Sequence, residues 1–165
     1  MHQKKTIVEL RALDVMSDAT TLLQAGMNAD EAGQVFKVNR ITGAPVIDEE
    51  GQVVGVLSVT DLLAYETGVD IGSKHSARLY HMSDLIRTIE PNEKLEVRSL
   101  KDAKIEELMT RNFVHAMSHT SLAAVASLML ERKVRRVLII DGGRLMGIVT
   151  HTDVLKAVSR GIGEA

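Results

Sequence analysis

The sequence predicts an α+β fold made of two copies of one motif, each running strand-helix-strand-strand-helix. The first observation is an internal repeat: residues 15–48 align without gaps on residues 108–141, and residues 55–63 align on residues 147–155 after a one-residue shift in a turn. The second is composition, since 45% of the 165 residues are hydrophobic and only 2% are aromatic. Two small sheets that share an aliphatic core are therefore expected.

Each copy begins with a short apolar strand and a helix. The repeat places the strands at Thr20–Leu23 and Phe113–Ala116. In the first copy Asn28 is the expected N-cap, and Glu31 three residues later completes a capping box for a helix that ends near Val38.

The corresponding helix of the second copy is expected from Leu122 to Arg132, after the N-cap Ser121. Its apolar residues recur with helical spacing, which predicts one buried face. The residues predicted on this face are Leu122, Val125, Ala126, Met129 and Leu130.

Two strands joined by a tight turn follow in each copy. Gly142-Gly143 between apolar runs indicates a two-residue hairpin, because the favoured turns require positive φ. A last helix is expected to start at Thr60 or Thr152. The predicted strand pairs are Ala44–Ile47 with Val53–Ser58, and Val137–Ile140 with Leu145–Thr150.

These elements divide the chain into a first repeat at residues 8–65, a connector at 66–104 and a second repeat at 105–161. The connector carries one amphipathic helical pattern, which Pro91 is expected to end. The apolar residues of this pattern are Leu79, Met82, Leu85, Ile86 and Ile89.

Composition narrows the classes of function. The net charge of −2 gives no global attraction to nucleic acid or anionic membranes. The absence of cysteine excludes disulfides and thiol chemistry and fits a reducing compartment. Without a signal-peptide pattern or a run long enough to span a bilayer, the expected location is the cytoplasm.

The repeated pattern resembles the CBS domain family, named for the regulatory domains of cystathionine β-synthase. The resemblance rests on residues 41–48 and 54–61 in the first copy, and on residues 134–141 and 147–153 in the second. It implies that the two repeats pack sheet to sheet as one module, with clefts that commonly hold adenosyl ligands. The second copy departs from the pattern at Leu138, where the first copy keeps Pro45.

The expected ligand-binding residues lie at the start of each last helix and along the neighbouring strands. Asp61 and Asp153 can accept hydrogen bonds from ribose hydroxyls, and hydroxyl side chains beside a helix N-terminus favour phosphate. Small residues and the first strand of the second copy suit an adenine slot. Besides the two carboxylates the candidate residues are Ser58, Thr60, Thr150, Thr152, His151, Gly43, Ala44, Val114, His115 and Ala116.

A basic run makes the two copies unequal. Arg135 and Arg136 stand where the first copy has Thr42 and Gly43, so they are candidate phosphate partners. The site with Asp153 is therefore expected to bind more strongly, or to take the more highly phosphorylated ligand.

Each candidate also has an explanation without a ligand. Asp61 and Asp153 would be favourable in a first helical turn on dipole grounds, Thr60 or Thr152 would serve as N-caps, and cations suit a helix end. For His115 with His119 and for His75 with His81, no metal-ligand spacing is present, so no metal is expected. No catalytic motif is found, and an enzyme is not predicted.

The favoured function is a regulatory module that senses AMP, ADP, ATP or S-adenosylmethionine, requires no other cofactor, forms a homodimer and signals to a separate protein. The alternative is a dimerisation or protein-interaction module without a ligand. A third hypothesis is regulation of a nucleic-acid-binding partner, while direct binding to nucleic acid or a membrane is not favoured.

Overall fold

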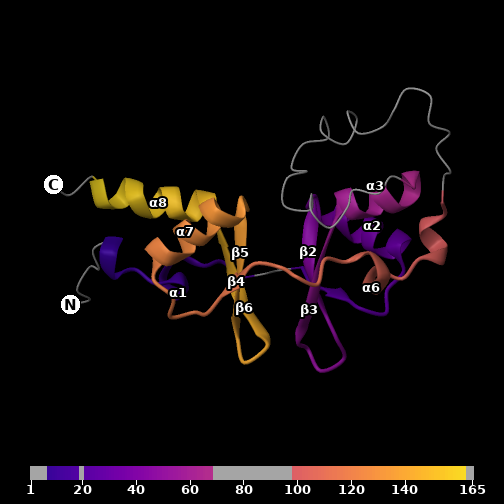
Figure 1. The fold of residues 1–165 in the computed structure, drawn as a ribbon, viewed down its shortest axis with the longest axis horizontal. Helices are drawn as coiled ribbons and strands as arrows, with labels where there is room; N and C mark the ends of the chain where they lie inside the picture. The colour runs from indigo at the N-terminus through magenta and orange to yellow at the C-terminus, as the bar shows by residue number, and fades with distance from the viewer. Residues whose placement is uncertain (1–6, 19–20, 69–97, 163–165) are drawn as a thin grey trace. The chain divides into compact units, whose positions relative to one another are not determined.

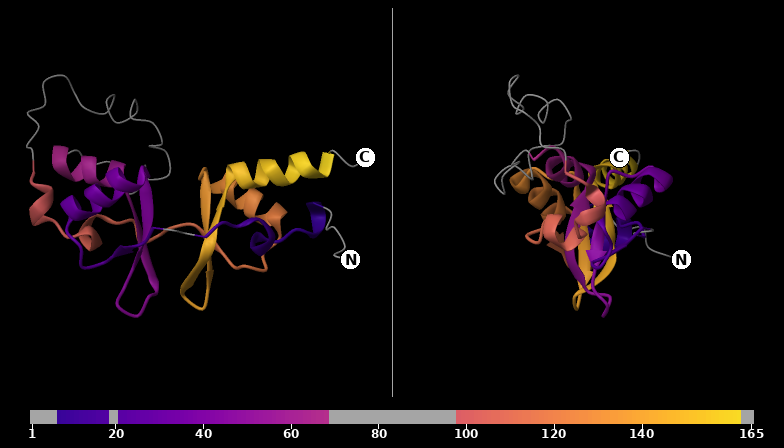
Figure 2. Two further views of the ribbon diagram at one scale, coloured as in Figure 1. Left: turned by 180° about the vertical axis from the view of Figure 1, so that it is seen from behind. Right: turned by 90° about the vertical axis from the view of Figure 1, so that its right-hand side faces the viewer.

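The computed structural model describes residues 7–18, 21–68 and 98–162. The chain forms two compact units, each a three-stranded sheet with helices on one face (Figures 1 and 2). The first unit comprises residues 21–113, and the second combines residues 1–20 with residues 114–165. The predicted α+β fold with two repeats is confirmed.

The sheet of the first unit has the strand order β1-β2-β3. The short β1 runs parallel to β2, and β2 pairs antiparallel with β3 through a hairpin. Helices α2 and α3 cover the sheet and enclose a core that includes Leu23, Phe36, Val46 and Leu57. The elements are β1 Leu23–Gln24, α2 Ala29–Asn39, β2 Gly43–Ile47, β3 Val53–Ser58, α3 Val59–Thr67, the 3-10 turn η2 Leu100–Asp102 and α6 Ile105–Leu108.

The second unit repeats this topology with the order β4-β5-β6. Its core includes Leu122, Val125, Val137, Ile139 and Val149. The elements are the 3-10 turn η1 Ile7–Glu9, α1 Ala12–Val15, β4 His115–Ala116, α7 Leu122–Arg132, β5 Arg136–Asp141, β6 Arg144–Thr150 and α8 His151–Ile162.

The N-caps of α2 and α7 are those that the sequence predicts. Asn28 Oδ1 accepts from Glu31 N at 2.8 Å, and Glu31 Oε2 accepts from Asn28 N at 2.9 Å, which closes the predicted capping box. Ser121 Oγ accepts from Ala124 N at 3.2 Å. The amides at these helix starts therefore have partners before any tertiary contact is made.

Replacing Asn28 with alanine should lower the free energy of unfolding by about 1 kcal/mol, because both bonds of the capping box are lost. Urea unfolding followed by circular dichroism measures the change. Gln34→Ala, at an exposed position of the same helix, is the control and should stay within about 0.5 kcal/mol of the parent. Equal effects of the two substitutions would contradict the role of the cap.

The predicted first strand of each copy and the predicted buried face of α7 are wrong. In the second copy this strand is His115–Ala116 and not Phe113–Ala116. The first strand lies at Leu23–Gln24 and not at Thr20–Leu23, because pairing of Leu23 with Val46 sets the register and leaves Leu22 outside the sheet and 41% exposed. On α7, Leu130 is 79% exposed, whereas Leu122, Val125 and Met129 are buried. The buried face of this helix is thus narrower than the apolar periodicity indicates.

The turn between β5 and β6 is the predicted two-residue hairpin. Gly142 has φ 58° and Gly143 has φ 83°, and Asp141 pairs with Arg144 across the turn. Positive φ at both central residues is the conformation that favours glycine in such turns.

The segments that precede the two sheets are exchanged between the repeats. The stretch with η1 and α1 precedes the first sheet in sequence but packs in the second unit, whereas η2 and α6 precede the second sheet and pack in the first unit. Ala12 and Ile105, which the repeat aligns, are both fully buried. Each unit is therefore completed by the leading segment of the other repeat.

The same pair of backbone hydrogen bonds anchors each exchanged segment to the outer strand of a sheet. Ser17 N donates to Ile148 O at 3.0 Å, and Ile148 N donates to Ser17 O at 2.9 Å. Thr110 and Val56 form the equivalent pair at 2.9 and 3.0 Å. These bridges cover part of the outer edge of β6 and of β3, which would otherwise present unpaired backbone groups.

The predicted connector helix falls outside the described residues. None of the helices that the structure describes is long and apolar enough to cross a membrane.

Candidate functional site

The candidate residues of each unit gather where the last strand meets the last helix. In the first unit Ser58 ends β3 and caps α3, and Gly43 at the start of β2 pairs with Ser58. In the second unit Thr150 ends β6 and pairs with Arg136 at the start of β5. This arrangement, called here the strand–helix corner, occurs once in each unit.

In both corners the aspartate closes a capping box on the residue three positions before it. Asp61 Oδ2 accepts from Ser58 N at 2.7 Å and from Ser58 Oγ at 2.6 Å. Asp153 Oδ2 accepts from Thr150 N at 2.9 Å and from Thr150 Oγ1 at 2.6 Å. The helices begin at Val59 and His151, so the caps are Ser58 and Thr150 and not Thr60 or Thr152.

The capping box changes what each carboxylate offers a ligand. One oxygen, Oδ2, already accepts two hydrogen bonds within the repeat. Oδ1 of Asp153 lies 3.7 Å from Nζ of Lys156, a residue that is not among the predicted site residues. In each carboxylate Oδ2 is therefore held by the cap, and Oδ1 is the oxygen that takes no part in it. This favours one charge-assisted hydrogen bond from a ligand hydroxyl over a bidentate pair of bonds.

The two carboxyl groups differ in acidity. Burial raises the pKa of Asp61 above its usual value, despite the hydrogen bonds from Ser58 that lower it. At Asp153 burial also acts to raise the pKa, but hydrogen bonds from Thr150 and the ammonium of Lys156 together outweigh it, and the pKa is lowered. The more basic second unit thus holds its carboxylate ionised more firmly.

These opposite shifts predict opposite pH dependences of stability. A lowered pKa in the folded state means that the stabilisation from Asp153 is present above the unfolded pKa and is lost as pH falls through the folded pKa. A raised pKa means that the contribution of Asp61 is present below the unfolded pKa and is lost as pH rises through the folded value.

Urea unfolding of the parent, Asp61→Asn and Asp153→Asn at several pH values between about 3 and 7 tests this contrast. The stability advantage of the parent over Asp153→Asn should shrink on acidification, and its advantage over Asp61→Asn should grow. Parallel pH dependences for the two variants would contradict it.

The residues predicted to bind adenine differ in position and exposure between the two units. Val114, His115 and Ala116 lie beside the middle of β5: His115 pairs with Leu138, and Leu138 N donates to Val114 O at 3.3 Å. His115 is exposed. In the first unit the side chain of Ala44 is buried in the core, so this residue offers a ligand only its backbone.

Gly43 lies where the backbone approaches closely. A Cβ on this residue would come 3.0 Å from Leu57 O and 3.4 Å from Ser58 Cα. The small residue predicted for an adenine slot therefore also suits the close packing of β2 on β3, where an added Cβ would force its neighbours to shift.

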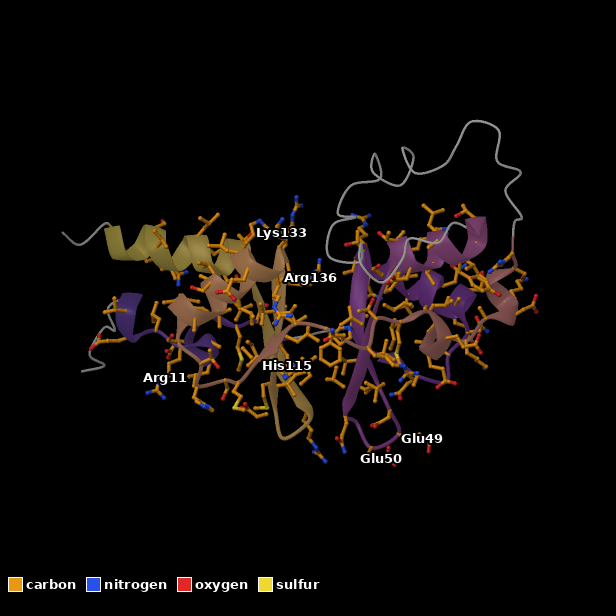
Figure 3. All side chains as sticks on the ribbon, in the orientation of Figure 1. Arg11, Glu49, Glu50, His115, Lys133 and Arg136 are labelled. Carbon is orange, nitrogen blue, oxygen red and sulfur yellow. The ribbon has the colours of Figure 1, made fainter. Side chains whose placement is uncertain are left out.

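Basic side chains mark the corner of the second unit (Figure 3). Arg135 and Arg136 are exposed, and Arg136 stands across from Thr150 on the same face of the sheet. His151 N donates to Arg135 O at 3.0 Å, which fixes the start of α8 against this strand. Lys133 ends α7 in the left-handed region at φ 54°, and Arg40 ends α2 at φ 53°.

The side chains of His151 and Thr152 are exposed on the first turn of α8, and Thr60 is half-buried at the equivalent place on α3. The ring nitrogen Nδ1 of His151 lies 3.4 Å from Arg135 O. Among the described residues no group of three or more His, Asp or Glu side chains could hold a metal ion. His75 and His81 lie outside the described residues.

Comparison with known proteins identifies the pattern. A family model described as "CBS domain" matches residues 12–68 and 105–160. A CBS domain-containing protein of Arabidopsis thaliana, CBSX1, chloroplastic, is 33% identical over 129 residues, which cover 78% of this chain. This chain spans 54% of that relative's length.

Two solved structures share the fold. A crystal structure of CBSX2 in complex with AMP has a TM-score of 0.65 at 26% identity and covers 91% of this chain and 96% of its own. The CBS domain pair of protein MJ0100 in complex with 5′-methylthioadenosine and S-adenosyl-L-methionine has a TM-score of 0.59 at 23% identity and covers 93% of this chain and 96% of its own.

Proposed function

Because this chain belongs to the CBS domain family, we propose that it is a regulatory module that binds an adenosyl ligand at its strand–helix corners. The observation that carries the proposal is the repetition of one polar corner in both units. Each corner presents an aspartate held by a Ser or Thr cap at the start of the last helix. Two related proteins were solved with adenosyl ligands, one of them AMP.

The chemistry of the corner suits a nucleoside. The carboxylate oxygen that is not bonded within the cap can accept from a ribose hydroxyl, which is a charge-assisted bond. The first amides of the helix and the hydroxyls of Ser58, Thr60, Thr150 and Thr152 favour phosphate oxygens. The ligand class comprises AMP, ADP, ATP and S-adenosylmethionine, and no other cofactor is required.

Isothermal titration of the full chain with these four ligands tests the proposal. Micromolar affinity for at least one of them is the expected result. If none of the four bound to a folded sample, the adenosyl-sensor function would be rejected.

We infer further that the second unit takes the more highly phosphorylated ligand. Arg135 and Arg136 stand at its corner, where the first unit has Thr42 and Gly43. Guanidinium groups bind phosphate oxygens bidentately. A ligand with more phosphate groups is therefore expected to bind this corner with higher affinity.

Arg136→Ala should reduce affinity for ATP about 10-fold and affinity for AMP by less, because it removes a phosphate partner and leaves the carboxylate in place. Parallel titrations of both ligands measure the two changes. Arg144→Ala, which removes an exposed cation at the far end of the same hairpin, is the control. An equal loss for both ligands, or the same loss in the control, would contradict the assignment.

The exposed apolar residues of α7 and α8 support homodimer formation as part of the proposal. Leu130 is 79% exposed and Leu155 is 62% exposed, on helices that pack against each other. Sedimentation velocity should show a dimer that Leu155→Ser weakens. A dimer that binds none of the ligands would instead favour an interaction module.

Occupancy of the corners is proposed to signal to a separate protein.

A further inference from the structure

In the second unit a lysine lies beside the oxygen of Asp153 that takes no part in the cap. Thr150 N and Thr150 Oγ1 donate to Asp153 Oδ2 at 2.9 and 2.6 Å, whereas Nζ of Lys156 lies 3.7 Å from Oδ1. Burial acts to raise the pKa of Asp153, but the bonds from Thr150 and the ammonium of Lys156 outweigh it. A cation therefore lies at the oxygen to which a ribose hydroxyl would donate.

The contact between Lys156 and Asp153 is one that a ligand can break. It is longer than a charge-assisted hydrogen bond, which measures about 2.7–2.9 Å. The Lys156 side chain is 62% exposed, and ion pairs with a solvent-exposed partner contribute little to stability. The flexible stem of lysine also lets its ammonium take other positions. Lys156 is therefore available to another anion at little cost to the fold.

The Lys156 side chain extends toward the N-terminus of α8, where a phosphate is expected to bind. The helix begins at His151, and a rise of about 1.5 Å per residue places Lys156 about 7.5 Å further along the axis. Side chains on a helix lean toward its N-terminus, and the contact with Asp153, three residues earlier, directs the ammonium to that end. The first amides of α8 and the ammonium of Lys156 can therefore serve one phosphate group.

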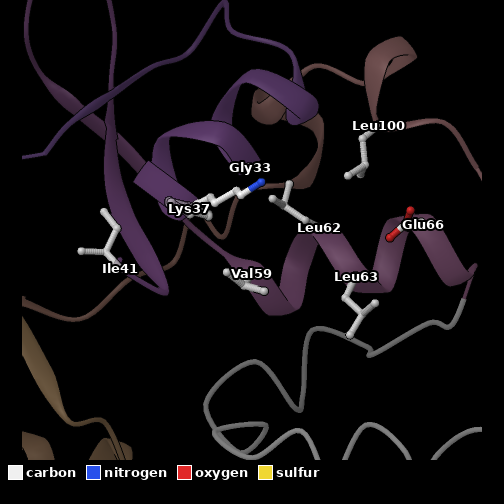
Figure 4. Close-up of a pocket in the computed structure, with 9 residues that line it drawn as sticks. Gly33, Lys37, Ile41, Val59, Leu62, Leu63, Glu66 and Leu100 are labelled. Carbon is white, nitrogen blue, oxygen red and sulfur yellow. The ribbon is translucent and has the colours of Figure 1, made fainter. Parts of the chain in front are cut away.

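The first unit has no cation at the equivalent position. The repeat aligns Lys156 with Ala64, one residue beyond the aligned stretch, and α3 contains no lysine or arginine. Val59, at the start of α3, lines an apolar pocket whose charged residues are Lys37 and Glu66 (Figure 4). The last helices of the two units thus share one kind of cap and differ in the charge beside it.

We propose that Lys156 is a specificity-determining residue that makes the second corner select phosphorylated adenosyl ligands over unphosphorylated ones. On binding, its ammonium passes from Oδ1 of Asp153 to the ligand phosphate, and the released oxygen accepts from a ribose hydroxyl. A ligand without phosphate offers the ammonium no other anion, so its hydroxyl must compete for Oδ1. The first corner, with Ala64, lacks this selection. The inference rests on the proposed binding of adenosyl ligands at the corners.

Adenosine and AMP are the probes, because they differ only in the phosphate. Titration calorimetry of the full chain is carried out in the Asp61→Ala background, so that the second corner is the one measured. With Lys156 present, AMP should bind about tenfold more tightly than adenosine, or more. Lys156→Ala should reduce this ratio about fivefold, because AMP loses a partner while adenosine loses a competitor.

Two further substitutions separate the role of Lys156 from general effects of charge and packing. Arg160 lies one turn further along α8 and is also exposed. Arg160→Ala removes the same charge and should leave the AMP-to-adenosine ratio within about twofold of its starting value. Lys156→Gln keeps most of the length of the side chain without its charge, so it should act as Lys156→Ala does.

The outcomes distinguish this inference from the proposed function. If both probes bind and Lys156→Ala leaves their ratio unchanged, or weakens both equally, the inference is rejected and the proposed function stands. The same change in Arg160→Ala would also reject it. If neither probe binds to folded protein, the second corner is not an adenosyl site, and the inference falls with it.

The repeat allows the reverse experiment in the first corner. Ala64→Lys in the Asp153→Ala background places a lysine three residues after Asp61, the spacing found in the second unit. The AMP-to-adenosine affinity ratio should rise about threefold over that of Asp153→Ala alone. A ratio that does not rise would overturn the proposal.

Discussion

Asp153→Ala should weaken adenosyl-ligand binding about 10- to 100-fold, because the substitution removes a charged acceptor for the ribose. A hydrogen bond to a charged group contributes about 1.5–3 kcal/mol, which corresponds to that range of affinity. Titration calorimetry with the ligand that binds most tightly measures the loss. Asp153→Asn keeps an oxygen for Thr150 and removes the charge, so it should show most of the same loss.

Asp153→Ala also removes the capping box of α8, which lowers the free energy of unfolding by about 1 kcal/mol. The affinity must therefore be compared with a variant that loses a similar bond away from the corner. Asp141→Ala provides it: Asp141 Oδ1 accepts from Ser118 N at 3.0 Å at the far end of β5. Unchanged affinity in Asp153→Ala, or an equal loss in Asp141→Ala, would remove Asp153 from the site. Asp61→Ala measures the other corner in the same way.

Gly147→Ala should destabilise the protein by about 1–3 kcal/mol through overpacking. A Cβ at this position would lie 2.8 Å from Ser17 O and 3.0 Å from Met16 Sδ. Because the first obstacle is backbone, the exchanged segment has to move, and its two hydrogen bonds with Ile148 would be strained. Urea unfolding measures the change.

The repeat offers a matched comparison at Gly55. Its Cβ would meet the side chain of Met109, with Met109 Cγ at 2.8 Å. A side chain can shift where a backbone carbonyl cannot, so Gly55→Ala should cost less than Gly147→Ala, and Met109→Ala should relieve part of that cost in a double-mutant cycle. Gly26→Ala, with nothing within 4 Å of the added Cβ, should be close to neutral. Equal free energies of unfolding for Gly147→Ala, Gly55→Ala and Gly26→Ala would contradict the packing argument.

The sequence predicts the elements that local chemistry determines. Asn28 and Ser121 mark helix starts because capping depends on residues three positions apart, and Gly142-Gly143 marks a hairpin because two positive φ angles are needed. The internal repeat supplies the topology. These features need no knowledge of distant contacts.

What the sequence does not predict depends on pairing between distant segments. The repeat aligns Ser17 with Thr110, but the alignment is the same whichever sheet each residue joins, so the exchange is not visible in it. The cap at Ser58 has a local signal in the sequence, since Ser58 and Asp61 have capping-box spacing. The prediction instead places the cap two residues later, at Thr60, whereas the helix begins at Val59. Helical periodicity predicts a buried Leu130, which is exposed, because periodicity does not report how wide the buried face is.

The exchange of the leading segments also orders events on the ribosome. The first unit is complete in sequence once residue 113 has emerged, whereas residues 7–18 have their partners only after β5, β6 and α8 are made. At a synthesis rate of about 5–20 residues per second, the roughly 45 residues up to Ala157 take about 2–9 s. During that time Ala12 and Met16 have no sheet to pack on. A segment that is translated before the first unit is thus buried only after that unit is complete.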